Sequence, residues 1–173
     1  SFPTRRSSDL ALSTAQLKGL SATQLGQLGS NQAAALTSTQ VGALTSQQLN
    51  GLSSDAVAAL DSQDLNNISN SVLKKLNTSF IANLNSDQVG NLSTAKVSAL
   101  SSTQIAAIET DDITAMTSAQ LNALTSLQIG SLTTDQIQTL TDTQIGYLAT
   151  SQIKFLSTTQ AQALTSSQIQ AMS

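Results

Sequence analysis

A large apolar side chain returns at every eighth residue from Leu12 to Met172, and the spacing never shifts by a residue. Most members of the series are Leu, with Ile or Met at a few places. A short fixed period indicates a repeat architecture, in which each unit buries its apolar face against neighbouring copies of itself. We number the positions of each octad from one to eight, with Ser13 at position one of the first octad, so this series occupies position eight.

Three further positions have a restricted composition. Position five is Leu, Ile or Val except at Ala33 and Ala161, and position one is Ser, Thr, Asn or Asp except at Gly29, Glu109 and Ala149. Position four is mostly Gln, and its exceptions are Ala56, Asp64, Val72, Phe80, Lys96 and Asp112. Position seven is frequently Ala or Gly, which favours close approach of neighbouring backbones.

The pairing of a hydroxyl at position one with Gln three residues later has the form of a helix capping box. The hydroxyl accepts from the backbone N–H at position four, and the Gln side chain accepts from the N–H at position one. Both donors would otherwise lack partners at the start of a helix. Because the pattern recurs in register with the apolar positions, it predicts that a new helix begins at every octad.

The apolar spacing supports the same interpretation. Positions five and eight share a helical face, but in one unbroken helix that face would advance by about 80° per octad and wind around the rod. A break at position one resets the angle, so each short helix can point both side chains into one interior. A lone octad buries too little to offset its ordering entropy, so stability should come from stacking and grow with copy number.

A β-solenoid is the alternative architecture, because stacked Thr, Ser and Gln also suit β-strands. In an unbroken strand, positions five and eight would face opposite sides, and a bend within the octad would be needed to bring them together. The Ala-rich position seven, the scarcity of aromatic residues and the repeated capping signal favour helices.

Composition excludes several functions. The chain has no Cys and no His, which rules out the usual zinc, haem and thiol chemistry and any Ser-His triad. No apolar run approaches the ~20 residues that span a bilayer, so we expect no membrane insertion. Beyond residue 9 the chain carries five Lys, no Arg and nine acidic residues, which offers no basic stripe for nucleic acid.

Residues 1–10 stand outside the repeat. Residues 1–9, Ser-Phe-Pro-Thr-Arg-Arg-Ser-Ser-Asp, resemble the translated read-through of a common sequencing adapter, and a natural basic leader is the alternative. We expect residues 1–10 not to be native. Residues 11–173 then form a single octapeptide-repeat solenoid of twenty octads, over residues 13–172, within a fragment of a longer array.

Three regions of the sequence are candidate sites. Glu109, Asp111 and Asp112 form the densest acidic cluster, which is either a calcium site or, more simply, a solvated face without the Gly-containing spacing of a calcium loop. Octads 69–84 depart most from the consensus, which indicates either a recognition patch or repeat drift in which Val72 and Phe80 cover extra core.

Two aromatic residues provide the candidate binding site. Tyr147 and Phe155 occupy position seven of consecutive octads and are predicted either to form an exposed pair on which a glycan stacks or to fill a groove between coils. We predict no catalytic, metal or cofactor-binding residues, and no cofactor.

The unit [Ser/Thr]-x-x-Gln-[Ile/Leu]-x-Ala-Leu, as in residues 117–124 and 165–172, resembles octapeptide-repeat arrays of very large bacterial surface or secreted proteins. The resemblance covers residues 12–173 and implies a tightly wound α-solenoid of one-to-two-turn helices. It implies an extracellular or cell-surface location in bacteria and transfers no functional residues.

The sequence therefore predicts an all-α solenoid with positions five and eight inside and a uniform Ser, Thr and Gln exterior. The predicted function is non-catalytic: a spacer or stalk whose partners are neighbouring repeats and flanking domains of the same chain. The alternative is an extended binding surface for glycan, for a cell surface or, more remotely, for ice, and an enzyme is a distant third.

Overall fold

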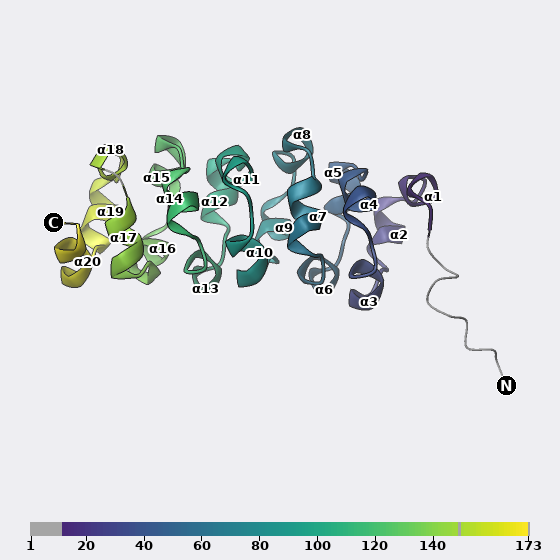
Figure 1. Ribbon diagram of the computed structural model, residues 1–173, viewed down its shortest axis with the longest axis horizontal. Coiled ribbons are helices and arrows are strands. Elements are labelled where there is room, and N and C mark those ends of the chain that lie inside the picture. The colour runs from purple at the N-terminus through teal and green to yellow at the C-terminus, as the bar shows by residue number, and fades with distance from the viewer. Residues whose placement is uncertain (1–11, 149, 173) are drawn as a thin grey trace.

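The computed structural model describes residues 12–148 and 150–172, which form a rod of short helices with the first helix, α1, at one end and the last, α20, at the other (Figure 1). This part of the chain contains twenty α-helices, one in every octad, and no β-strand. The all-α prediction is confirmed, and the β-solenoid alternative is wrong. In chain order the helices are α1 Thr14–Lys18, α2 Ala22–Leu25, α3 Ser30–Ala33, α4 Ser38–Gly42, α5 Ser46–Leu49, α6 Ser54–Ala58, α7 Ser62–Asn67, α8 Asn70–Leu73, α9 Thr78–Ala82, α10 Ser86–Gly90, α11 Thr94–Ala99, α12 Ser102–Ala106, α13 Thr110–Ile113, α14 Ser118–Asn122, α15 Ser126–Ser131, α16 Thr134–Thr139, α17 Asp142–Tyr147, α18 Thr150–Ile153, α19 Thr158–Ala163 and α20 Ser166–Ala171.

The predicted capping box starts most of these helices. At α14, Thr117 is extended (φ −75°, ψ 162°), its Oγ1 accepts from the backbone N–H of Gln120, and Gln120 Oε1 accepts from the N–H of Thr117. No described residue has a positive φ. Each helix for which the N-cap is described therefore follows an extended residue, which most often caps the helix with a hydroxyl. The turns do not require the left-handed backbone conformation that only glycine adopts readily.

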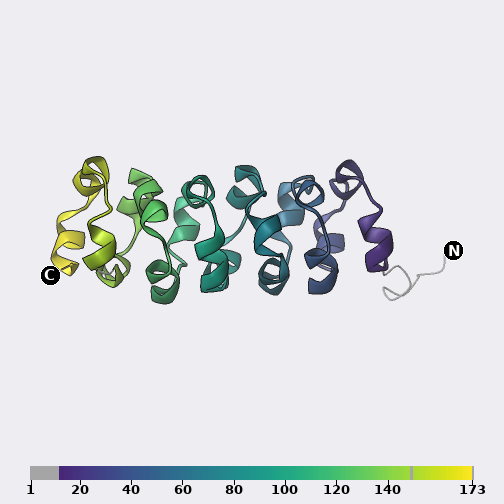
Figure 2. The ribbon, with the colours of Figure 1, turned by 90° about the horizontal axis from the view of Figure 1, so that it is seen from above.

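Successive octads wind into a superhelix. Helix pairs in extensive contact lie three octads apart, as α4 and α7, α10 and α13, and α17 and α20 do. Some side chains reach one octad further, since Gln88 bonds to the octad that begins 32 residues before its own, at Ser53. One turn of the solenoid thus contains between three and four octads, and Figures 1 and 2 show these turns stacked along the rod.

The core follows the predicted positions. Position five is fully buried through the middle of the array, as Leu121 and Ile129 are, and position eight is nearly so, as at Leu124. The predicted polar exterior is wrong for position four, because its Gln side chains are buried from Gln48 onward. Their amides find hydrogen-bond partners inside, so burying them leaves no unpaired polar group. The buried members are Gln48, Gln88, Gln104, Gln120, Gln128, Gln136, Gln144, Gln152, Gln160 and Gln168.

Small residues allow the turns to approach closely. A Cβ added at Gly26, in position six, would lie 2.5 Å from the carbonyl oxygen of Gly51, which is in position seven three octads later. A Cβ at Gly51 would lie 2.6 Å from the carbonyl oxygen of Ala22. The expected close approach at position seven is therefore confirmed, and its partners are positions six and two of an earlier turn.

Candidate functional site

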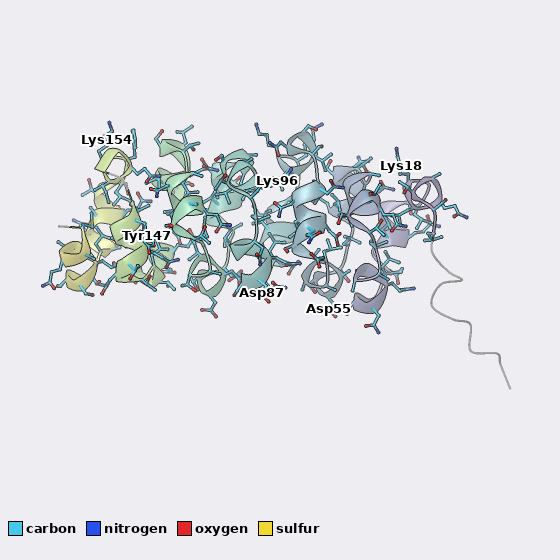
Figure 3. All side chains as sticks on the ribbon, in the orientation of Figure 1. Lys18, Asp55, Asp87, Lys96, Tyr147 and Lys154 are labelled. Atoms are coloured by element: carbon cyan, nitrogen blue, oxygen red, sulfur yellow. The ribbon has the colours of Figure 1, made fainter. Side chains whose placement is uncertain are left out.

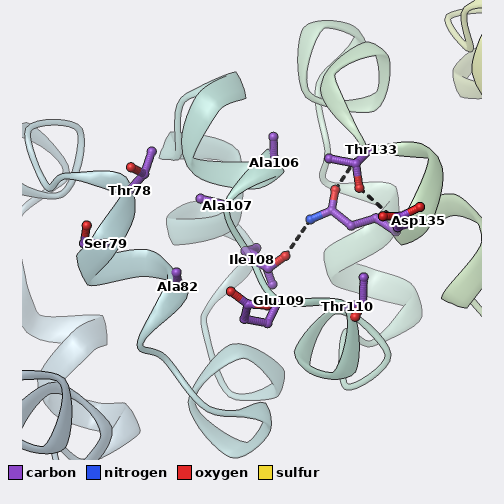
Figure 4. Close-up of a pocket in the computed structure, with 11 residues that line it drawn as sticks. Thr78, Ser79, Ala82, Ala106, Ala107, Ile108, Glu109, Thr110, Thr133 and Asp135 are labelled. Atoms are coloured by element: carbon purple, nitrogen blue, oxygen red, sulfur yellow. Dashed lines mark hydrogen bonds between the residues drawn. The ribbon is translucent and has the colours of Figure 1, made fainter.

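A shallow groove recurs on the surface where one octad joins the next. One such groove, of about 360 Å³, is lined by position seven and eight residues of one octad (Ala107, Ile108) and position one and two residues of the next (Glu109, Thr110), with walls from α9 and α16 (Figure 4). Two further grooves have equivalent linings, around residues 59–62 and around residues 98–102. The grooves therefore follow from the repeat rather than from one specialised sequence.

Two of these grooves carry acidic residues at equivalent positions. Glu109 and Asp135 line one groove, and Asp61 and Asp87 line another. Asp111 and Asp112 do not line the groove that contains Glu109, so the acidic cluster seen in the sequence does not converge there. Within the described residues, no group of three or more Asp and Glu side chains is placed to hold a metal ion.

The interior holds a ladder of amides that sequence reasoning did not foresee. The position-four Gln caps its own helix through Oε1, as predicted, but its Nε2 donates across the turn to carbonyl oxygens 28 and 31 residues earlier. Gln120 Nε2 lies 2.8 Å from the carbonyl oxygen of Val89 and 2.7 Å from that of Leu92. These carbonyls belong to positions five and eight, at and just beyond the end of an earlier helix. The position-five carbonyl also accepts from a backbone N–H of its own octad, as Val89 does from Leu92.

The same bond recurs in almost every turn. The distance from Nε2 to the position-eight carbonyl oxygen lies between 2.6 and 3.1 Å in Gln48, Gln88, Gln104, Gln120, Gln128, Gln136, Gln144, Gln152, Gln160 and Gln168. No buried side-chain nitrogen or oxygen in the described residues lacks a hydrogen-bond partner. One residue type, Gln, thus caps the start of its own helix and also satisfies a carbonyl oxygen that follows an earlier helix.

A model of the ALTTAQ repeat matches residues 7–38, 57–94 and 105–142, which together are more than half of the chain. The chain belongs to the ALTTAQ repeat family. No curated protein matches it. The stretches between the matches, residues 39–56 and 95–104, continue the octad spacing and the short helices without interruption.

Some substitutions at position four of this ALTTAQ array keep a hydrogen bond to an earlier turn. Lys96 Nζ donates to the carbonyl oxygen of Ile68, 28 residues earlier, and to Oδ1 of Asn70 at 3.0 Å. Burial lowers the pKa of the Lys96 ammonium, because the charged form loses solvation. Asp64 and Asp112 cannot donate, and each instead accepts from a serine hydroxyl of the turn before, Ser38 and Ser86 respectively.

The apolar substitutions fill core space. Phe80 and Ala56 are buried, and Val72 is partly buried against the core. This placement supports the interpretation of octads 69–84 as repeat drift that covers extra core. The neighbouring Lys74 and Lys75 are exposed.

The external position six carries a second set of bonds between turns in the ALTTAQ array. Asn50 Nδ2 donates to the carbonyl oxygen of Lys75, and its Oδ1 accepts from the N–H of Asn77. Asn66 makes the equivalent pair of bonds to Asn91 and Ser93. These Asn side chains bridge to the octads that follow them, whereas the Gln ladder bridges to octads that precede it.

Some acidic residues and some lysines lie on opposite edges of the rod. Asp55, Asp87, Asp111 and Asp135 occupy the first turns of α6, α10, α13 and α16. Figure 3 shows Asp55 and Asp87 on the lower edge and Lys18 and Lys154 on the upper edge. An acid in the first turn of a helix is favoured by the helix dipole, so each Asp supports its own helix.

The two aromatic candidates are both accessible. Tyr147 is 45% exposed and Phe155 is 44% exposed. In the described part of the chain the ring contact is between Phe155 and its neighbour Lys154, whose Nζ lies 5.2 Å from the ring centroid. The role of the two rings in binding stays a prediction. Across residues 12–148 and 150–172, no helix has the length and apolar character that crossing a membrane requires.

Proposed function

We propose that the chain is a non-catalytic spacer, a stalk segment that holds other parts of a large bacterial surface or secreted protein at a distance. The observation that carries this proposal is the amide ladder, in which the same buried bonds join most turns to the one before. Each octad adds a similar increment of length and buries the same two apolar positions, so the reach of such an array is set by copy number.

The surface chemistry is consistent with this role. Ser and Thr are the commonest residue types on the exterior, and the described grooves are shallow and repeat with the octads instead of forming one distinct pocket. The resemblance to octapeptide arrays of bacterial surface proteins supports the proposed location. Flanking domains of the same chain are the proposed partners.

Small-angle scattering tests the spacer directly. We would compare the described array with arrays of half and of twice its number of octads. If the array is a spacer, its maximum dimension should grow in proportion to the number of octads, while the cross-sectional radius of gyration stays constant. A maximum dimension that grows only as the cube root of the mass would contradict the proposal.

An extended binding surface is the second candidate, favoured by the exposed rings of Tyr147 and Phe155. A glycan array probed with the unmodified chain and with Tyr147→Ala and Phe155→Ala variants tests it. Binding that both substitutions abolish would support a glycan-binding role. A blank array, or binding that both variants retain, would leave the spacer as the sole proposed function.

A further inference from the structure

The amide ladder is interrupted over one complete turn of the solenoid. Position four is Ala56, Asp64, Val72 and Phe80 in four successive octads, and none of these side chains can donate a hydrogen bond as Gln does. On either side the ladder is intact, since Gln48 donates to Leu20 and Gln88 donates to Leu60.

The acceptors opposite this gap also form a continuous set. In the register of the ladder, residues 28 positions before the gap are Leu28, Leu36, Leu44 and Leu52. Within the described residues, no side chain of the following turn donates to their carbonyl oxygens. The other interruption in the described ladder, at Asp112, is a single octad flanked by Gln104 and Gln120, which both donate.

Other contacts hold residues 53–84 against residues 21–52. Ser38 donates to Asp64, Asn67 donates to the carbonyl oxygen of Ser38, and Asn50 bonds to Lys75. The Asn67 and Asn50 bonds are exposed, where water competes for both partners. Buried Phe80 contributes apolar contact, which is not directional.

We propose that this interface is a joint built into the array, at which residues 13–52 separate from the rest of the solenoid as a unit before any other turn opens. In a repeat protein each interface contributes its own nearest-neighbour stability, so cooperativity breaks where an interface lacks the buried amide bonds that join the other turns. The contact between α4 and α7 spans this interface but does not replace those bonds. The proposal depends on the fold and not on the spacer function.

Native-state hydrogen exchange of the whole chain tests the joint. The matched comparison is the last turn, residues 141–172, which is joined to the turn before it by Gln144, Gln152, Gln160 and Gln168. We expect amides of residues 21–52 to exchange together, with protection at least about tenfold lower than those of residues 141–172. Equal or greater protection in residues 21–52 would overturn the proposal.

One substitution adds an amide donor at the first interface, and a second removes a donor from the other interface. Val72→Gln places a donor in register with the carbonyls of Val41 and Leu44, and we expect it to raise protection of residues 21–52 severalfold while leaving residues 141–172 unchanged. Gln160→Val removes the donor to Ile129 and Leu132 and should lower protection of residues 141–172 alone. If Val72→Gln leaves the exchange of residues 21–52 unaltered, the missing donors do not define a joint. Scattering decides the spacer separately, since an array without a joint can still lengthen with copy number.

Discussion

The Nε2 of Gln120 donates to the carbonyl oxygen of Leu92 across 2.7 Å, although the two residues are 28 positions apart. The Oε1 of the same amide accepts from the backbone N–H of Thr117 at 2.7 Å. A single side chain therefore satisfies an orphan donor at the start of α14 and an orphan acceptor beyond the end of α10. Gln is suited to this position because its terminal amide carries both a donor and an acceptor.

Gln120→Glu separates the two halves of this role. The carboxylate still accepts from Thr117, but its second oxygen faces the carbonyl oxygens of Val89 and Leu92. We expect a loss of about 3 kcal/mol in the free energy of unfolding, from an unpaired buried charge and two lost bonds. Urea unfolding followed by far-ultraviolet circular dichroism measures it.

Gln24→Glu is the matched control. Gln24 caps α2 in the same way, but it is exposed and the described chain has no earlier turn for its Nε2 to reach. This variant should change stability by less than about 0.5 kcal/mol. Similar losses of stability in the two variants would mean that position-four Gln stabilises the array through the capping box alone and not through the bond between turns.

Gly26→Ala should destabilise the array by about 1–3 kcal/mol, because the new methyl group would lie 2.5 Å from the carbonyl oxygen of Gly51 and would push two turns apart. Gly130 also occupies position six, but a Cβ there would lie 3.5 Å from the nearest atom, the carbonyl oxygen of Phe155. Gly130→Ala should be neutral or slightly stabilising, because Ala has the higher helix propensity. Thermal unfolding of both variants distinguishes a packing effect from a general effect of removing glycine.

Lys96 should make stability depend on alkaline pH. Burial lowers its pKa in the folded chain below the ordinary value of 10.5, so the folded state binds fewer protons than the unfolded state between the two values. Stability should therefore rise as the pH increases through this interval, since the cost of burying the charge is present at lower pH and is relieved above it. The Lys96→Gln variant should lose this slope when urea unfolding is compared at neutral and alkaline pH.

Lys96→Met provides the control for the hydrogen bonds. It removes the charge and also the donor to Ile68, so it should lose the same slope but be less stable than Lys96→Gln at every pH. A slope that persists in both variants would assign the pH dependence to other groups.

Glu109 is an unfavourable N-cap residue for α13. It precedes α13 as the N-cap but makes no side-chain hydrogen bond to the helix. Glu109→Ser supplies a hydroxyl in reach of the N–H of Asp112 and should stabilise the chain by about 0.5–1 kcal/mol. Glu109→Gln removes the charge without adding a favourable cap, and a thermal shift as large as that of the serine variant would show that relief of acidic repulsion is responsible.

Sequence periodicity was sufficient for the helices and for most of the core. A hydroxyl at Thr117 and an amide at Gln120 lie three residues apart, so their pairing is local and can be inferred without knowing where the chain goes next. The number of octads per turn was not accessible in this way. It depends on how the backbones pack, for example on the contact between Gly26 and Gly51, and such contacts between distant residues leave no local signature.

The same limitation explains the error about Gln. Its Oε1 partner is local and was predicted, whereas its Nε2 partners lie 28 and 31 residues away, and without them a surface location was the simpler expectation. The signal was nevertheless present, because a cap requires only an acceptor and Glu would serve as well as Gln. The prevalence of Gln and the absence of Glu at position four indicate that the donor half of the amide is favoured there.

The candidate surface residues were predicted less completely. Tyr147 and Phe155 are exposed, which was one of the two alternatives that the sequence left open, and binding to them stays a prediction. The grooves between octads were not foreseen, because each is assembled from four octads that are brought together only by the superhelix.

One superhelical turn does not contain a whole number of octads, and this has a consequence for how such arrays evolve. Because a turn holds more than three octads but fewer than four, gaining or losing one octad rotates everything beyond it by roughly a quarter to a third of a revolution about the rod axis. Duplication of a short DNA segment would therefore re-aim a distal domain as well as move it outward. Length and orientation are inherited together.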